Sequence, residues 1–237
     1  MIHGQPIPLV IYRELRSSVR ASFGKDHIIF RTPVHLTPTQ FQKQFTWLQN
    51  WLEQKMTENP HLFQPYQSSR TYQSGDTIRI RGQQFLISIE EVDKKSHSGT
   101  IDGQAVKLRL GKMEHPQAFN QVVRKLLSRL FGQYFLPEIK ERVHALNKLF
   151  FQQDIQQVKL KYTHTRWGSC SSKGNINLST RLLLAPKEVV DYVIVHELSH
   201  LVEFNHSPRF WNLVEQIMPN YREHERWLKQ YGSACDF

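Results

Sequence analysis

Three histidines and one glutamate are concentrated between residues 196 and 206. His196 and His200 lie four residues apart, with Glu197 directly after the first of them. On an α-helix, positions four apart differ by about 40° in rotation, so both imidazoles would point to the same side, one turn apart. This arrangement suits two ligands of one zinc ion. Glu197, about 100° round the helix, could act as a base beside the metal.

His206 is the candidate for a third ligand. On an unbroken helix it would be rotated by about 600° from His200, away from the metal, so the chain must turn before it. Asn205, which tolerates a left-handed conformation, and Ser207-Pro208, which has the form of an N-cap followed by a first helical residue, predict such a turn. The alternative third ligands are Glu203, Glu215, Glu223 and His224.

The same pattern could occur by chance on an ordinary amphipathic helix, since an apolar face is present. That face consists of Val190, Val193, Ile194, Leu198 and Leu201. The spacing of the third histidine and the flanks that suit a helix favour a metal site. Three imidazoles leave one position of a tetrahedral zinc ion open for water, so we predict one zinc ion per chain.

Composition narrows the class of protein. The chain has 237 residues, of which 39% are hydrophobic, and a net charge of +10. Because the basic excess forms no block, a nucleic-acid arm is not indicated, although a basic patch assembled by the fold remains possible. Cys170 and Cys235 are expected to be free thiols. The sequence has no signal peptide and no apolar run of membrane-spanning length, which predicts a cytoplasmic protein.

The first half of the chain is expected to be rich in β-strands. Short apolar runs within 7–36 predict a small antiparallel sheet, and Thr37-Pro38 predicts the start of a long helix. Residues 57–74 have the composition of a linker. A hairpin around Gly82 and a strand at 105–110 complete this region. We assign residues 1–115 to it, as a scaffold or as a device for substrate selection.

The second half, residues 116–237, begins with a helical pattern that Pro137 should kink or divide. Residues 158–162 and 176–184 alternate as two strands, separated by a loop at 165–174 that is rich in glycine and serine. Pro186 then precedes the helix that carries His196. The 176–184 strand could present an unpaired edge to an extended peptide. Two further helices are expected after residue 207 and from Tyr221. The predicted fold class is α+β.

Four segments resemble the YgjP-like metallopeptidase family. They are Arg166-Trp167-Gly168-Ser169-Cys170, Asn177-Leu178, the 196–200 core, and Asn205-His206-Ser207-Pro208-Arg209-Phe210-Trp211. The resemblance implies a minimal zincin-like domain, related to SprT-like and WLM-type peptidases, with a long helix, a small antiparallel sheet, a metal helix and C-terminal helices. It also implies that His196, His200 and His206 are the ligands and that Glu197 is the catalytic acid and base. Members of the family have been linked to hydrolysis of nucleoside triphosphates as well.

We therefore predict a zinc-dependent hydrolase that acts on peptides or proteins, in which Glu197 activates a zinc-bound water. One alternative is a nucleoside triphosphate pyrophosphohydrolase, with Arg166, Lys173 and Arg181 holding phosphates. A second is a DNA-associated protease or a non-catalytic zinc-binding module. Arg166 and Tyr221 are candidates for stabilising the oxyanion. The full set of candidate substrate-binding residues is Arg166, Trp167, Asn177, Ser179 and Tyr221.

Overall fold

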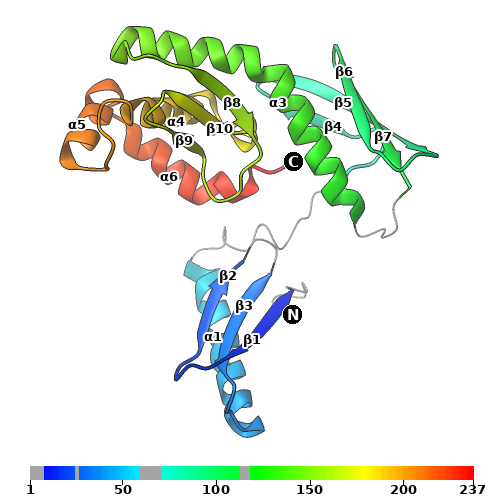
Figure 1. Cartoon of the computed structure of the whole chain (residues 1–237). Coiled ribbons are helices and arrows are strands. Elements are labelled where there is room, and N and C mark those ends of the chain that lie inside the picture. The colour runs from blue at the N-terminus through cyan, green and yellow to red at the C-terminus, as the bar shows by residue number, and fades with distance from the viewer. Residues whose placement is uncertain (1–7, 25–26, 59–70, 113–117) are drawn as a thin grey trace. The chain divides into compact units, whose positions relative to one another are not determined.

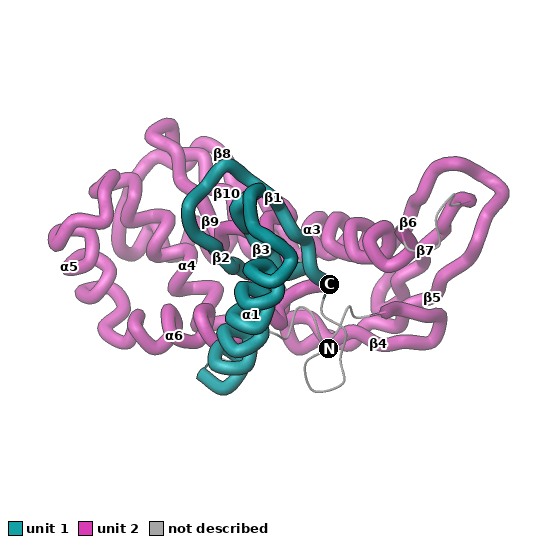
Figure 2. Tube along the Cα trace, turned by 90° about the horizontal axis from the view of Figure 1, so that it is seen from below, with its two compact units in different colours: residues 1–69 teal, residues 70–237 magenta. Residues whose placement is uncertain are grey.

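The computed structural model describes residues 8–24, 27–58, 71–112 and 118–237, and the chain divides into two compact units. Unit 1 spans residues 1–69 and unit 2 spans residues 70–237 (Figure 2). The boundary proposed at residue 115 falls within 113–117, outside the described residues, and most of the predicted linker falls on 59–70, which also lie outside them. The described residues form a mixed α+β structure with five α-helices and three small sheets.

Unit 1 contains one sheet and one helix. Its elements are β1 (Leu9–Glu14), β2 (Arg20–Phe23), β3 (Ile28–Pro33) and α1 (Pro38–Glu58). The sheet has the order β1-β3-β2, with β1 parallel and β2 antiparallel to β3. The prediction of an antiparallel sheet is therefore wrong for β1. An unforeseen strand, β2, reverses the chain between the two, so β1 and β3 run in the same direction.

Helix α1 begins where the sequence predicts. The backbone N–H of Gln40 donates to the Thr37 hydroxyl at 3.3 Å, and the Thr37 N–H donates to the Gln40 side chain at 2.9 Å. This reciprocal capping satisfies two donors of the first helical turn. The buried Leu48 and Leu52 of α1 pack against Ile28 and Phe30 of β3 to form the core of unit 1.

Unit 2 begins with a four-stranded sheet. Its strands are β4 (Thr77–Ile80), β5 (Gln83–Val92), β6 (Ser98–Asp102) and β7 (Ala105–Gly111), in the order β4-β5-β7-β6. The predicted β4–β5 hairpin is confirmed, and both of its turn residues, Arg81 and Gly82, have positive φ. Strand β6, which the sequence pattern did not predict, lies between β5 and β7 in the chain, so β5 and β7 pair in parallel.

Helix α3 (Phe119–Leu146) runs between this sheet and the second sheet of unit 2 (Figure 1). It continues through Pro137, so the predicted division is wrong, but Figure 1 shows a bend along its length. Pro137 has no N–H to donate to the carbonyl of Gln133, which weakens the helix locally. Phe131 of α3 packs edge to face on Phe85 of β5, with ring centroids 4.9 Å apart.

The second sheet of unit 2 consists of β8 (Gln157–Lys161), β9 (Gly168–Cys170) and β10 (Asn175–Ser179), in the order β8-β10-β9. It is mixed, because β8 is parallel and β9 antiparallel to β10, and the predicted antiparallel sheet is therefore wrong. The glycine-rich loop contains β9. It turns into β10 at Gly174, whose φ is +74° and where a Cβ would collide with the carbonyl oxygen of Asp154.

The predicted 176–184 strand is only partly correct. Strand β10 ends at Ser179, and residues Thr180–Leu184 form a 3-10 helix that Ser179 caps. The leucines at 182 and 183 are nevertheless buried, because alternation over so few residues does not separate a strand from a tight helix. Strand β10 is also the central strand of its sheet, so the predicted unpaired edge is wrong.

Three helices complete unit 2: α4 (Lys187–Ser199), α5 (Pro208–Ile217) and α6 (Tyr221–Tyr231). The segment after α6 enters the core, where the fully buried Phe237 stacks on Phe131 at 5.9 Å. Helix α4 is tied to α3 by Arg142, which donates two hydrogen bonds to the Asp191 carboxylate at 2.7 and 2.8 Å. No helix in the described part of the chain combines the length and apolarity that crossing a bilayer requires.

Candidate metal centre

Helix α4 carries His196, and its C-cap is His200, which lies just before the turn that leads to the third histidine. Its last helical residue is Ser199, and the backbone N–H groups of Val202 and Glu203 both donate to the Ser199 carbonyl, at 3.1 and 2.9 Å. These bonds wrap the chain around the helix end. Asn205 does not adopt the predicted left-handed conformation, since Arg81 and Gln152 are the only described non-glycine residues with positive φ.

The next helix begins as predicted and fixes the far side of this turn. Ser207 is the N-cap of α5, its side chain accepts from the Phe210 N–H, and Pro208 occupies the first turn. His206 is therefore held between two helix ends. The predicted turn before His206 is confirmed. The hydrogen bonds to the Ser199 carbonyl at the end of α4 produce it, and not a residue in the left-handed conformation.

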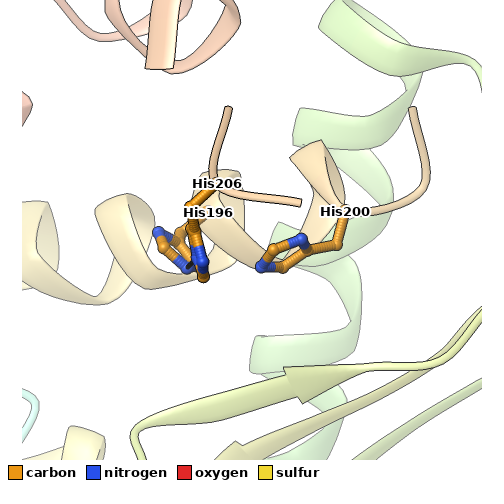
Figure 3. Close-up of side chains that lie close together, drawn as sticks. All are labelled: His196, His200 and His206. Atoms are coloured by element: carbon orange, nitrogen blue, oxygen red, sulfur yellow. Dashed lines mark hydrogen bonds between the residues drawn. The ribbon is translucent and has the colours of Figure 1, made fainter. Parts of the chain in front are cut away.

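The three histidines meet in one place. One ring nitrogen of each of His196, His200 and His206 lies within 4.8 Å of those of the other two. Figure 3 shows the three side chains pointing toward one another. The two Nε2 atoms of His196 and His206 are 3.0 Å apart. Two nitrogens on a tetrahedral zinc ion lie about 3.3 Å apart, so this triad fits such an ion after small adjustments.

The second ring nitrogens of His196 and His200 have different surroundings. Nδ1 of His200 lies 3.3 Å from the Glu203 carbonyl oxygen, which leaves its Nε2 free to face the metal. Nδ1 of His196 is buried and has no hydrogen-bond partner among the described residues. The Phe210 ring lies within 5.0 Å of all three imidazole rings and backs the site.

Burial also sets the protonation state of the triad. It lowers the pKa of His196 to about 4, and the charges of His200 and His206 lower it further in the same direction. The pKa of His200 is lowered chiefly by burial as well. Because a metal binds the neutral imidazole, these shifts keep two of the three candidate ligands ready for binding at neutral pH.

The Glu197 side chain is buried, with 6% of its surface exposed. Burial raises its pKa to about 7, and the charge of Arg166 opposes that shift. A carboxyl group with a pKa near the operating pH can both accept and return a proton. The nearby thiol of Cys170 has a pKa raised to about 11, first by burial and second by Glu197, so it is protonated.

Gly168 of β9 makes room for the Glu197 carboxyl group. A Cβ atom at Gly168 would lie 2.6 Å from Cγ and 2.7 Å from Cδ of Glu197, and closer still to its Oε1. The strand backbone therefore packs directly on the carboxyl group. Sequence reasoning gave this glycine no such role. The signal was present, because Gly168 stands in a stretch of the chain that resembles the family.

Several candidate substrate residues instead have structural contacts. Ser179 is buried and donates to the Thr163 carbonyl at 3.0 Å, and Asn177 donates to the Ser169 hydroxyl at 3.3 Å. The Trp167 ring lies under the Arg181 guanidinium, 4.4 Å from it. These contacts account for the three side chains without a substrate.

Arg181 is occupied as well. Its guanidinium donates to the carbonyl oxygens of Gly232, Cys235 and His164, at 2.5, 2.6 and 3.0 Å. It is 6% exposed, and three of its five N–H donors are already used in these bonds.

The remaining candidates lie nearer the triad. Tyr221 is buried and stacks on Trp211, which itself stacks on His206. Arg166 is exposed and acts on Glu197 through its charge. The alternative third ligands Glu203, Glu215, Glu223 and His224 do not belong to the described cluster of ligand atoms, which consists of the three histidines.

Comparison with known proteins finds a matching family and two similar solved structures. The family model for the YgjP-like metallopeptidase domain matches residues 18–231. The metallopeptidase zymogen abylysin from Pyrococcus abyssi is similar over 38% of this chain and 92% of its own, with 25% identity and a TM-score of 0.36. The zymogen jannalysin from Methanocaldococcus jannaschii is similar over 39% of this chain and 94% of its own, with 23% identity and a TM-score of 0.35. No curated protein matches the chain.

Proposed function

The chain belongs to the YgjP-like metallopeptidase family, and on that premise we propose that it is a zinc-dependent peptidase whose ligands are His196, His200 and His206. Family membership indicates a metal-dependent peptidase with peptide or protein substrates. The convergence of three ring nitrogens within 4.8 Å is the observation that supports the ligand set. An all-nitrogen set with one open position favours zinc over magnesium or calcium, which prefer oxygen ligands.

A zinc ion bound there would supply a Lewis acid that lowers the pKa of water to near 7 and polarises a carbonyl group. Glu197 would accept the proton of the attacking water and return it to the departing amine. Without metal, burial raises the pKa of Glu197 to about 7, and the positive charge of a bound zinc ion would lower it again and favour the carboxylate that accepts the proton. The backbone at Gly168 would limit the positions open to the carboxyl group on that side.

Strand β9 is the proposed binding edge for an extended peptide. It pairs with β10 on one side and is an edge strand of its sheet in the described residues. It also packs on α4 beside Glu197, as the contact at Gly168 requires. A peptide that added a strand along β9 would have its backbone near the proposed base. This proposal replaces the 176–184 edge, because β10 is central.

The experiment compares the parent with Glu197→Gln and His206→Ala, all expressed with added zinc. We expect one zinc per chain and cleavage of a diverse peptide library for the parent. Glu197→Gln should keep the zinc and lose about 10²- to 10⁴-fold in rate, because the amide cannot accept a proton. His206→Ala should bind zinc more weakly. Full zinc affinity in His206→Ala, or normal cleavage by Glu197→Gln, would refute the corresponding role.

A further inference from the structure

A pocket with a volume of about 340 Å³ lies in unit 2 between α3, the end of β8 and the start of the 3-10 helix. It is lined by Lys125, Ser128, Arg129, Gly132, Gln133, Leu136, Leu160, Lys161, Tyr162 and Thr180. None of these residues belongs to the metal centre. Strand β8 lies on the opposite edge of the sheet from β9, which packs on Glu197. The pocket is therefore a separate feature of the unit.

The pocket carries three positive charges and no negative one. Lys125 and Arg129 are four residues apart on one face of α3, and Lys161 ends β8. Among the described residues, none of these cations forms an ion pair with a carboxylate. Like charges gathered in a concave site raise its positive potential, so they repel one another unless an anion is bound.

The carboxylate of Asp236 contacts one of the lining residues, Tyr162, and has a cation of its own. The Tyr162 hydroxyl donates to Asp236 at 2.7 Å, and Arg124 lies 3.9 Å from the same carboxylate. Tyr162 thus faces its polar end toward Asp236, and that negative charge has its own partners.

The rest of the pocket wall is partly polar and partly apolar. The hydroxyl groups of Ser128 and Thr180, which both line the pocket, form a buried hydrogen bond of 2.7 Å. Gly132 has no side chain to fill the space, and a Cβ there would come within 2.9 Å of Thr180. Leu136 and Leu160 provide apolar surface. The wall therefore offers polar groups and apolar surface side by side, which suits a small molecule with a polar and an apolar part.

We propose that this pocket binds the phosphate monoester of a small organic molecule, independently of the metal centre. A phosphate group carries up to two charges and several acceptor oxygens, which matches two lysines and the planar fork of an arginine better than one carboxylate does. A volume of about 340 Å³ is at the small end of ligand pockets, which suits a compact ligand. The organic part would contact Leu136 and Leu160.

Phenyl phosphate is the probe, and protein NMR resonances are the readout. The full chain is titrated at constant ionic strength, before and after chelation of divalent metal, with benzoate as the carboxylate comparison. The test variant is Lys125→Gln with Arg129→Gln. The control variant is Lys140→Gln with Lys159→Gln, which also removes two positive charges but takes them from exposed lysines of α3 and β8 that do not line the pocket.

We expect phenyl phosphate to shift resonances of residues that line the pocket, with or without metal, and to bind more tightly than benzoate. The test variant should bind at least tenfold more weakly than the control variant. Shifts confined to the metal centre, loss of binding on chelation, or equal loss in both variants would overturn the proposal. Tighter binding of a single-stranded oligonucleotide through the same residues would replace it with a nucleic-acid surface.

Discussion

Replacing Gly168 with alanine should impair catalysis without removing a catalytic group. The new Cβ would lie 2.6 Å from Cγ of Glu197, whereas carbon atoms in contact are separated by about 3.5 to 4.0 Å. The carboxyl group or the strand must therefore move by about 1 Å. A displacement of that size at a reacting group lowers the rate about 10²-fold. Removing the base altogether lowers the rate by about 10²- to 10⁴-fold, so the alanine should cost no more than that.

The assay measures kcat on a peptide that the parent cleaves, together with zinc content and urea unfolding. Gly168→Ala should keep its zinc, lose about 10²-fold in kcat and lose about 1 to 3 kcal/mol of stability through overpacking. Gly99→Ala is the matched control. Its Cβ would come within 2.9 Å of the side chains of Leu108 and Leu130, so it should lower stability and leave kcat unchanged.

A double-mutant cycle then tests the contact itself. Glu197→Asp shortens the side chain by one methylene group and makes room for the alanine, so the stability cost of Gly168→Ala should be smaller in that background. Independent effects of the two changes would show that the alanine does not press on the carboxyl group. A kcat for Gly168→Ala within threefold of the parent would refute the proposed packing role.

Three predictions concern the contribution of buried ionisable side chains to the free energy of unfolding. Asp191→Ala should lower stability by about 1 to 3 kcal/mol in urea unfolding, because Arg142 loses both of its bonds to α4; an unchanged midpoint would contradict this. Arg181→Met should lower stability by about 3 kcal/mol or more, because three carbonyl groups lose a donor, and a loss of activity at unchanged stability would instead favour a ligand role. In metal-free protein, burial raises the pKa of Glu197 from 4.5 to about 7, so the native state holds a proton that the unfolded state releases between those pH values. The parent should thus lose about 3 kcal/mol relative to Glu197→Gln as pH rises from 4.5 to 7, and parallel pH profiles of the two proteins would contradict that pKa.

Local patterns predicted the helices around the site well. Helix periodicity placed His196 and His200 on one side, and the Ser207-Pro208 pair predicted the start of α5. The turn before His206 followed from geometry alone, because an unbroken helix cannot bring it back. These features depend on neighbouring residues, for which sequence rules carry most of the information.

Features that depend on distant residues were harder to predict. The short strand β9 has only three residues, Gly168–Cys170, and is defined by its pairing with β10 rather than by its own composition. The parallel pairs β1–β3 and β8–β10 likewise depend on strands inserted between them in the chain. The contact between Gly168 and Glu197 joins residues 29 apart, so no local rule reveals it.

The position of Phe237 has a consequence for synthesis on the ribosome. Its ring completes the stack on Phe131, and residues Gly232 and Cys235 receive the bonds of Arg181. Phe237 is translated about a hundred residues after Phe131. At about 5 to 20 residues per second, the ribosome needs roughly 5 to 20 seconds to synthesise the chain between them. During that interval the nascent chain exposes part of the apolar face of α3. A chaperone that shields this face would be most useful before residue 237 emerges.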